Sequence, residues 1–582
     1  MEYSRIFFTV LLSVTLLSLA SCQTTTDSEQ LSLEQGIQLE LVARHVSHQY
    51  GEGAAEIVAY DQSYKKLYVV NGASKAIDII DISQLPTVPL RLPYSGNNLS
   101  SQQLFLPKSV STAGAGMVKL GGPNSLAIHN DILAIAVATK NKQSSGAVLF
   151  YSLSDQTPSL IQSVSVGALP DMVAFTKDGS KAIVANEGEP SKDYHVDPEG
   201  SISIISMTPS IAHSAKHLRF TDFNSKRESL EKTGVKFASP EGTSVAQDLE
   251  PEYITVTDDG SRAYVSLQEN NALAIVDLQN NTILGVKGLG FKDWGKYKID
   301  VSNKDGVNAA YYENIFGLYQ PDSITSYQVN SKTYILSANE GDAREYIYQT
   351  TEAECKAAGH KFDDEDGCIS YTEEYRAKNL PIKSPSVIDS YYHKNGIGRL
   401  KVTNVLGDED GDGLHEKLYS YGARSFSIWD QAGDLVFDSG DDFEQRLIER
   451  YGEQFNSNEN ENKGDSRSDD KGAEPEAITV GLVKGKVYAF IGLERHGGIM
   501  IYDVSNPLQP TFASYVNNRD FSKEFEIDDE TDPVTLKGAY NQVGDLAPEG
   551  LVFIVAEESP TGKPLLAVAN EVSGSVSIYQ IE

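Results

Sequence analysis

The feature that most constrains the fold is a short sequence pattern that recurs along the whole chain. Its clearest copy, Asp248 to Leu278, is an apolar run opened by Pro-Glu, a turn at Asp258-Asp259-Gly260, a second apolar run, a polar tip and a third apolar run. That order predicts strand, hairpin, strand, polar turn and strand. Seven copies are found, and they begin at Glu56, Asn124, Asp171, Glu252, Asp322, Glu476 and Glu549.

Three-stranded units that repeat radially and gain a fourth strand are typical of β-propellers. The sequence therefore predicts an all-β fold, a seven-bladed β-propeller of the YVTN or WD40-like kind. The strand expected over residues 37–46 has no partner nearby in the sequence, and the last copy lacks a fourth strand. We expect the first strand to complete the last blade, which would close the ring and remove its free edges.

The predicted domain plan has three parts and one large insertion. Residues 1–21 are expected to be a signal peptide, 22–36 a lipid-linked flexible tether, and 37–582 the propeller. The insertion is expected over about 341–472, in or after blade five, because no copy of the repeat begins between Asp322 and Glu476.

The N-terminus predicts export and lipid attachment. Residues 6–21 are apolar or small, and the run is too short for a comfortable transmembrane helix. It ends Leu19-Ala20-Ser21-Cys22, which resembles a bacterial lipobox, so that Cys22 would carry the lipid. With Gln23 next, no Asp-type inner-membrane retention signal follows, which favours the outer membrane. The alternative is an ordinary signal peptide with an incidental cysteine.

The other two cysteines, Cys355 and Cys368, lie close together in the insertion. An even pair in an oxidising compartment predicts a disulfide. It would close a short loop and stabilise it by about 3 kcal/mol. A metal site is the alternative, although no second pair lies nearby to complete it.

The chain is strongly acidic, with a net charge of −33. Nucleic acid and anionic membrane surfaces are therefore poor partners, and any membrane contact is expected through the N-terminal lipid alone. Divalent cations are favourable partners. The alternative is that the acidity only keeps an exported protein soluble.

The repeat places many of these acids on one face. Within an antiparallel hairpin, the residue that opens the first strand lies beside the tip that follows the second strand. The openers are six carboxylates and one amide, namely Glu56, Asn124, Asp171, Glu252, Asp322, Glu476 and Glu549, and the tips include Glu187, Glu269, Glu340, Glu494 and Glu571. We expect them to ring the central channel and to bind a hard divalent cation, calcium or magnesium, although each could instead cap its hairpin.

A second calcium site is predicted in the insertion, at Asp408, Asp410, Asp412 and Glu416. Carboxylates at alternating positions followed by glycine can wrap one calcium ion. The stretch departs from an EF-hand, because its twelfth position is Tyr419 and no helices clearly flank it. The alternative is an acidic, solvated turn.

Catalytic motifs are sparse: the sequence has no P-loop, no Gly-x-Ser-x-Gly elbow and no His-Glu-x-x-His. Cationic groups do follow the acidic segments, and these catalytic candidates are Arg344, Arg495, His496 and His195. Arginine beside bridged calcium ions could hold a phosphate ester for attack by metal-bound water. The alternative role for each is a salt bridge.

The assembled segments resemble the choice-of-anchor I family, bacterial surface β-propellers related to mesenchyme-specific cell surface glycoproteins of animals. The matching segments are residues 51–61, 121–128, 166–179, 184–190, 248–256, 421–430, 467–481 and 546–551. Some relatives are labelled alkaline phosphatase, and the Pro-Glu-Gly-Leu element at 548–551 is similar to one in calcium-dependent propeller phosphatases.

Two hypotheses follow from the sequence and the resemblance. The first is a lipid-anchored, calcium-binding propeller of the bacterial cell envelope that acts as a surface binding or scaffold module. The second is a calcium-dependent phosphomonoesterase with its site at the acidic mouth of the propeller. Calcium-dependent turnover of a phosphate ester would separate them.

Overall fold

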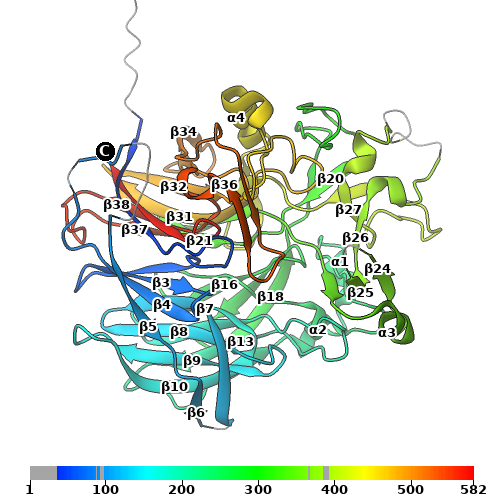
Figure 1. Cartoon of the computed structure of the whole chain (residues 1–582). Helices are drawn as coiled ribbons and strands as arrows, with labels where there is room; N and C mark the ends of the chain where they lie inside the picture. Colours follow the sequence, from blue (N-terminus) through cyan, green and yellow to red (C-terminus); the bar gives the residue numbers. More distant parts are fainter. Residues whose placement is uncertain are drawn as a thin grey trace, which may run out of the picture. The chain divides into compact units, whose positions relative to one another are not determined.

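β-Strands make up most of the regular structure in the computed structural model (Figure 1). The structure describes residues 36–86, 88–91, 98–113, 115–364, 367–384, 388 and 392–582, and Ile37–Glu582 forms one compact unit. The predicted signal peptide, Cys22 and nearly all of the tether lie outside the described residues. The expectation of an all-β protein is confirmed.

Six of the sheets in the described part of the chain have four antiparallel strands in simple order. They are β2 (Val58–Asp61), β3 (Lys66–Asn71), β4 (Ala76–Asp81) and β5 (Ser101–Phe105); β11 (Pro170–Phe175), β12 (Lys181–Asn186), β13 (Ser201–Ser206) and β14 (Lys216–Arg219); β15 (Ile254–Val256), β16 (Arg262–Leu267), β17 (Ala272–Asp277) and β18 (Thr282–Gly288); β21 (Ile324–Val329), β22 (Lys332–Asn339), β29 (Ser425–Trp429) and β30 (Leu435–Asp438); β31 (Pro475–Val483), β32 (Lys486–Leu493), β33 (Ile499–Asp503) and β34 (Thr511–Val516); and β37 (Pro548–Ile554), β38 (Leu565–Asn570), β39 (Ser575–Ile581) and β1 (Leu39–Val46).

The remaining sheets are larger or smaller variants. One has five strands, β6 (Ser109–Thr112), β7 (Gly116–His129), β8 (Ile132–Thr139), β9 (Ser145–Ser152) and β10 (Ser159–Ala168); a second has β19 (Phe291–Asp293), β20 (Ile315–Leu318), β28 (Leu418–Ser420), β27 (Lys401–Thr403) and β26 (Glu374–Arg376); and two small sheets hold β23 (Glu345–Tyr348), β25 (Gly367–Thr372) and β24 (Lys361–Asp363), and β35 (Phe525–Asp528) and β36 (Thr535–Gly538).

The second and third strands of each repeat are buried because their sequences are short apolar runs rich in β-branched residues. In β3 and β12 every residue after the first is buried. The core lies between neighbouring sheets: Ile183 and Ile202 of one sheet pack in a single cluster with Val265 and Ala274 of the next. Face-to-face packing of sheets in this way leaves the strand ends, and the polar residues there, on the two faces of the ring.

The strands that open the repeats contact one another in a closed series. β2 contacts β7, then β11, β15, β21, β31 and β37 follow in turn, and β37 contacts β2. β1 pairs antiparallel with β39, with Leu39 opposite Ile581 and Val46 opposite Ser575, so the expectation that the N-terminal strand completes the last sheet is confirmed. In Figure 1 the blue N-terminal segment accordingly runs beside the red C-terminal strands.

The large insertion differs from the prediction. β29 and β30 lie within the range 341–472, but they complete the sheet begun by β21 and β22, with Trp429 paired to Ile335. The chain therefore leaves this sheet between its second and third strands and returns. Such an excursion is tolerated because the entropic cost of closing a loop rises only slowly with its length.

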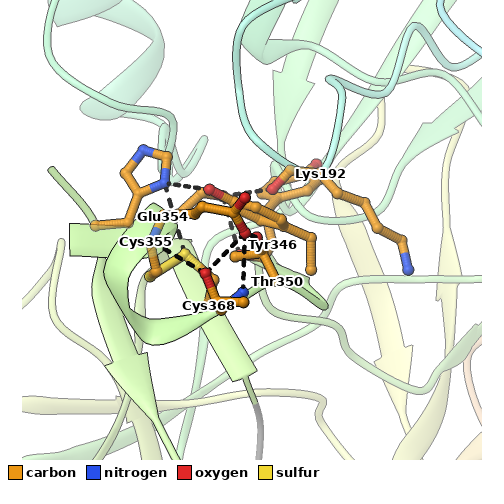
Figure 2. The surroundings of a disulfide bond; sticks show 10 residues. Lys192, Tyr346, Thr350, Glu354, Cys355 and Cys368 are labelled. Atoms are coloured by element: carbon orange, nitrogen blue, oxygen red, sulfur yellow. Dashed lines mark hydrogen bonds between the residues drawn. A yellow bond between two sulfur atoms is a disulfide. The ribbon is translucent and has the colours of Figure 1, made fainter. Parts of the chain in front are cut away.

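The segment between β22 and β29 contains regular secondary structure of its own. It contains β23 to β28 and α3 (Glu352–Ala357), and Cys355 and Cys368 form a disulfide within it, as predicted. Figure 2 shows this disulfide with Lys192 and Tyr346 close by. The Ser370 hydroxyl donates to the backbone oxygens of both, at 2.6 and 3.0 Å. These bonds tie the disulfide segment to the loop that follows β12.

The α-helices within the described residues are short. They are α1 (Arg227–Glu231), α2 (Val245–Asp248), α3 and α4 (Asp442–Tyr451). α4 packs Phe443 and Leu447 into the core beside β29. None of the helices in the described ranges is long and apolar enough to cross a membrane.

Candidate functional site: an acidic face at the repeat openers

The openers of different repeats meet at the centre of the ring. A cavity of about 70 Å³ is lined by Asn124, Asp171, Asp322 and Glu549, which open four different repeats. β7, β11, β21 and β37, which hold or directly follow these residues, belong to the closed series of contacts, so the four positions come together. The predicted convergence of openers is therefore confirmed for these four side chains.

Opener and tip carboxylates also meet within one hairpin, as the antiparallel register requires. Pro475 of β31 pairs with Leu493 of β32, which brings Glu476 beside Glu494. Glu340, the tip after β22, joins them, and ligand oxygens of Glu340, Glu476 and Glu494 lie within 4.8 Å of one another. We call these three residues the Glu340 group.

Two basic side chains of the protein, Lys471 and Arg495, form ion pairs with the Glu340 group. Lys471 Nζ lies 2.7 Å from a Glu340 oxygen, and Arg495 lies 3.1 Å from Glu494. Gln268 donates to the other Glu340 oxygen at 2.7 Å. The Oε2 atom of Glu476 is buried and has no hydrogen-bond partner among the described residues.

Burial and mutual repulsion disfavour ionisation of these acids. Burial, only partly offset by Lys471, raises the pKa of Glu340 to about 8, and burial raises the pKa of Glu494 to about 7 despite Arg495. Burial, with Glu571 and Asp171 nearby, likewise raises the pKa of Glu56 to about 8. Lys471 and Arg495 therefore offset only part of the cost of burying these carboxylates.

A second acidic group lies at the ends of β12, β15 and β16. It includes Glu250, which the sequence analysis did not assign to a site. Glu187, Glu250 and Glu269 bring ligand oxygens within 4.8 Å of one another, and the opener Glu252 lies against Glu269. We call Glu187, Glu250, Glu252 and Glu269 the Glu250 group. Glu250 was missed because it precedes the opener instead of forming it.

A signal for Glu250 was nevertheless present, since the tripeptide Glu-Pro-Glu occurs both at 250–252 and at 474–476. The first glutamate of each is completely buried and bound by arginine. Arg344 holds Glu250 at 2.6 Å, and Arg495 and Arg467 hold Glu474 at 2.9 and 2.6 Å. In both tripeptides the first acid is thus a structural ion-pair partner and the second is the opener.

The predicted loop site has its ligands in place but already holds an internal cation. Lys383 Nζ lies 2.5 Å from Asp410, 3.1 Å from Asp412 and 2.6 Å from Glu416. Asp408 accepts backbone N–H bonds from residues 411, 412 and 413 at 2.8, 3.1 and 2.9 Å. We call these four acids the Asp408 loop. Bonds to Lys383 lower the pKa of Asp410.

The catalytic candidates do not form one constellation. Arg344 is buried against Glu250, and Arg495 is paired with Glu474. His496 is completely buried between the rings of Tyr451 and Phe521, at 4.7 and 4.9 Å, and burial holds its pKa well below the usual range. These three side chains are committed to packing or to ion pairs.

His195 lies elsewhere, on an exposed turn. Its side chain is 70% exposed and lies 3.3 Å from the Asp193 carboxylate. Nothing in the described part of the chain places a nucleophile beside it in a hydrogen-bonded arrangement of the kind that acid–base catalysis requires.

The closed ring of sheets with acids at its centre defines an all-β, propeller-like class of protein. The model of the choice-of-anchor I domain matches residues 56–507, and the chain belongs to that family. The chain is also 31% identical over 207 residues to gigasin-3a of Magallana gigas, covering 33% of this chain and 68% of gigasin-3a.

A second relative is much longer. The chain is 26% identical over 237 residues to the mesenchyme-specific cell surface glycoprotein of Strongylocentrotus purpuratus, covering 37% of this chain and 30% of that protein. Among solved structures, the chain is similar to the Kuenenia stuttgartiensis hydrazine synthase, with a TM-score of 0.42 and 11% identity over 92% of this chain and 97% of that one. It is also similar to the Myceliophteria thermophila Cps50 (Swd1) β-propeller domain, with a TM-score of 0.38 and 9% identity over 92% of this chain and 99% of that one.

Proposed function

We propose that this protein is a seven-bladed β-propeller, exported and lipid-anchored at Cys22 in the bacterial cell envelope, that binds calcium on its acidic face and acts as a surface binding module. Membership of the choice-of-anchor I family supports the surface location. The closed series of first strands from β2 to β37 supports the blade count. The outer membrane is the proposed site of anchoring.

The observation that carries the calcium proposal is the Glu340 group. Its three carboxylates come from two neighbouring repeats and place their oxygens within 4.8 Å of one another. Calcium binds oxygen at about 2.3–2.6 Å, so oxygens up to about 5 Å apart can share one ion. The Asp408 loop is a second, exposed calcium site in this proposal, which the ion would enter by displacing Lys383.

The test is calorimetric titration of calcium into chelator-treated full-length protein. We expect binding that weakens at least tenfold in Glu476→Gln, because this change removes a charge and keeps the shape. Unchanged binding in that variant would overturn the assignment to the Glu340 group. For the anchor, Cys22→Ala is expected to release the protein from the membrane fraction.

The second candidate function is a calcium-dependent phosphomonoesterase. The observation in its favour is that Lys471 and Arg495 lie beside the Glu340 group, where cations could hold a phosphate ester. Hydrolysis of p-nitrophenyl phosphate that requires calcium and is lost in Glu476→Gln would establish it. Calcium binding without turnover supports the binding module.

A further inference from the structure

The Glu250 group gathers four carboxylates from two neighbouring sheets. Glu187 follows β12 in one sheet, whereas Glu250 and Glu252 precede β15 and Glu269 follows β16 in the next. Their convergence is dictated by the hairpins, since the start of β15 and the end of β16 lie side by side, with Ile254 opposite Val265. None of the four belongs to the Glu340 group or to the Asp408 loop.

These acids are buried, and several of their oxygens lack partners. Glu250 is 0% exposed, and Glu252 and Glu269 are each 8% exposed. The Oε2 atom of all three has no hydrogen-bond partner in the described part of the chain. Buried polar atoms are nearly always satisfied in folded proteins, so three unpartnered oxygens in one place indicate a missing ligand.

Arg344 accounts for only part of the charge. Its Nη1 donates to Glu250 Oε1 at 2.6 Å, and its Nη2 donates to the backbone oxygen of Asp248 at 2.7 Å. One guanidinium thus faces four carboxylates and leaves Glu250 Oε2 open. An arginine that holds one oxygen and leaves the other available resembles the outer partner that orients a metal-binding carboxylate.

Glu252 and Glu269 add a geometric constraint. Their side chains lie within hydrogen-bonding reach of each other, although neither is a donor when ionised. Either a proton or a cation must lie between two such carboxylates. Because Glu187 and Glu250 also face this point, a cation can be shared by all four acids, whereas a proton satisfies only one pair.

We propose that Glu187, Glu250, Glu252 and Glu269 bind one calcium ion between the sheet of β11–β14 and the sheet of β15–β18. All-carboxylate ligation selects a hard divalent cation. Ligand oxygens of Glu187, Glu250 and Glu269 lie within 4.8 Å of one another, which fits the oxygen–oxygen span around calcium, and Glu252 reaches the same point through its contact with Glu269. Glu187 is only partly buried and provides the entrance. The ion would join the two sheets to the insertion, because Arg344 immediately precedes β23.

The experiment isolates this site from the other two. The background protein is full-length Glu476→Gln/Asp412→Asn, in which the Glu340 group and the Asp408 loop are each weakened by a near-isosteric change. After chelator treatment and dialysis, calcium is titrated by calorimetry. We expect one calcium ion to bind, and we expect Kd to rise at least tenfold when Glu269→Gln or Glu187→Gln is added.

Two outcomes would overturn the inference: no calcium binding in the background protein, or the same Kd after Glu187→Gln and Glu269→Gln are added. Because Glu187 is partly exposed, Glu187→Gln decides the question if Glu269→Gln does not fold. The single variants separate this inference from the proposed function. If Glu476→Gln binds calcium as the wild type does but Glu187→Gln does not, the Glu340 assignment fails and the Glu250 assignment stands.

Discussion

The Asp408 loop and the Glu250 group each contain four acidic residues, but they differ in sequence spacing, in burial and in the partners that already bind them. The loop acids are neighbours in sequence and are at least partly exposed, and Lys383 and backbone amides already bind them. The acids of the Glu250 group come from separate hairpins, are mostly buried, and retain unpartnered oxygens. The region with the recognisable calcium motif is therefore the one whose ligands are already satisfied.

The difference shows that a sequence motif indicates which ligands are available. The burial of those ligands decides how favourable the free energy of cation binding is. A calcium ion entering the loop must displace an ammonium group and competes with solvent, which screens exposed charges. A calcium ion entering the Glu250 group relieves carboxylates that have lost their water. We therefore expect tighter calcium binding at the Glu250 group than at the loop.

The largest expected effect is at Arg344, which offsets part of the negative charge of the Glu250 group. Arg344→Met should lower the free energy of unfolding by about 3–5 kcal/mol, because it leaves Glu250 buried without its ion-pair partner. Urea denaturation with and without calcium measures this loss. We expect calcium to restore part of it, since the ion would replace the missing positive charge.

A matched control is Arg219→Met. Arg219 pairs with Glu199 at 3.1 Å, but its side chain is 62% exposed. Exposed pairs contribute about 0–1 kcal/mol, so this change should be nearly neutral. Equal losses in the two variants would contradict the view that Arg344 balances buried acids.

The second largest effect on stability is expected from removing the disulfide between Cys355 and Cys368. Replacing Cys355 and Cys368 together by serine should destabilise the insertion by about 3 kcal/mol, because the covalent bond restricts the unfolded segment. Protease sensitivity of the insertion, followed by mass spectrometry, is the measurement. If cleavage is as slow as in the oxidised wild type, the segment is held by its contacts near Lys192 and Tyr346 instead.

A pH effect of intermediate size is expected at the Glu340 group in calcium-free protein. The pKa of Glu340 is raised from 4.5 to about 8, so between these values the folded state binds more protons than the unfolded state. Stability should therefore fall as pH rises from about 5 to 8, with Glu494, whose pKa is raised to about 7, contributing in the same direction. Thermal unfolding at several pH values tests the slope.

Calcium and Glu340→Gln both provide checks on this slope. The variant cannot ionise at that position, so its stability should depend less on pH over the same range. Saturating calcium should also flatten the curve, because the ion stabilises the ionised carboxylates. A rise in stability with pH in calcium-free wild type would have the wrong sign for this explanation.

The smallest effect is expected at Lys383, in the Asp408 loop. Lys383→Met should change stability by less than about 1 kcal/mol, because the ion pairs it removes are largely exposed. It should nevertheless raise calcium affinity at the loop, since the competing ammonium group is gone. Calorimetry in a Glu476→Gln/Glu269→Gln background measures that site alone, and unchanged affinity would show that Lys383 does not compete.

Much of the fold followed from the sequence because it depends on local pattern. The recurring order of apolar runs and turns predicted the strands that open and follow each repeat, and the unpaired first strand predicted the pairing of β1 with β39. The same order identified the openers that line the central cavity, such as Asp171 and Glu549. The boundaries of the insertion were wrong, since β29 and β30 rejoin a sheet interrupted long before.

The sequence by itself thus determined which acids occupy the ends of the hairpins, because strand period and register are local properties. Only the tertiary structure decided which of those acids are buried together, which are bound by Arg344, Lys471 or Lys383, and which keep free oxygens. The physical reason is that desolvation and charge pairing depend on distances between separate repeats, and no spacing within one repeat encodes them.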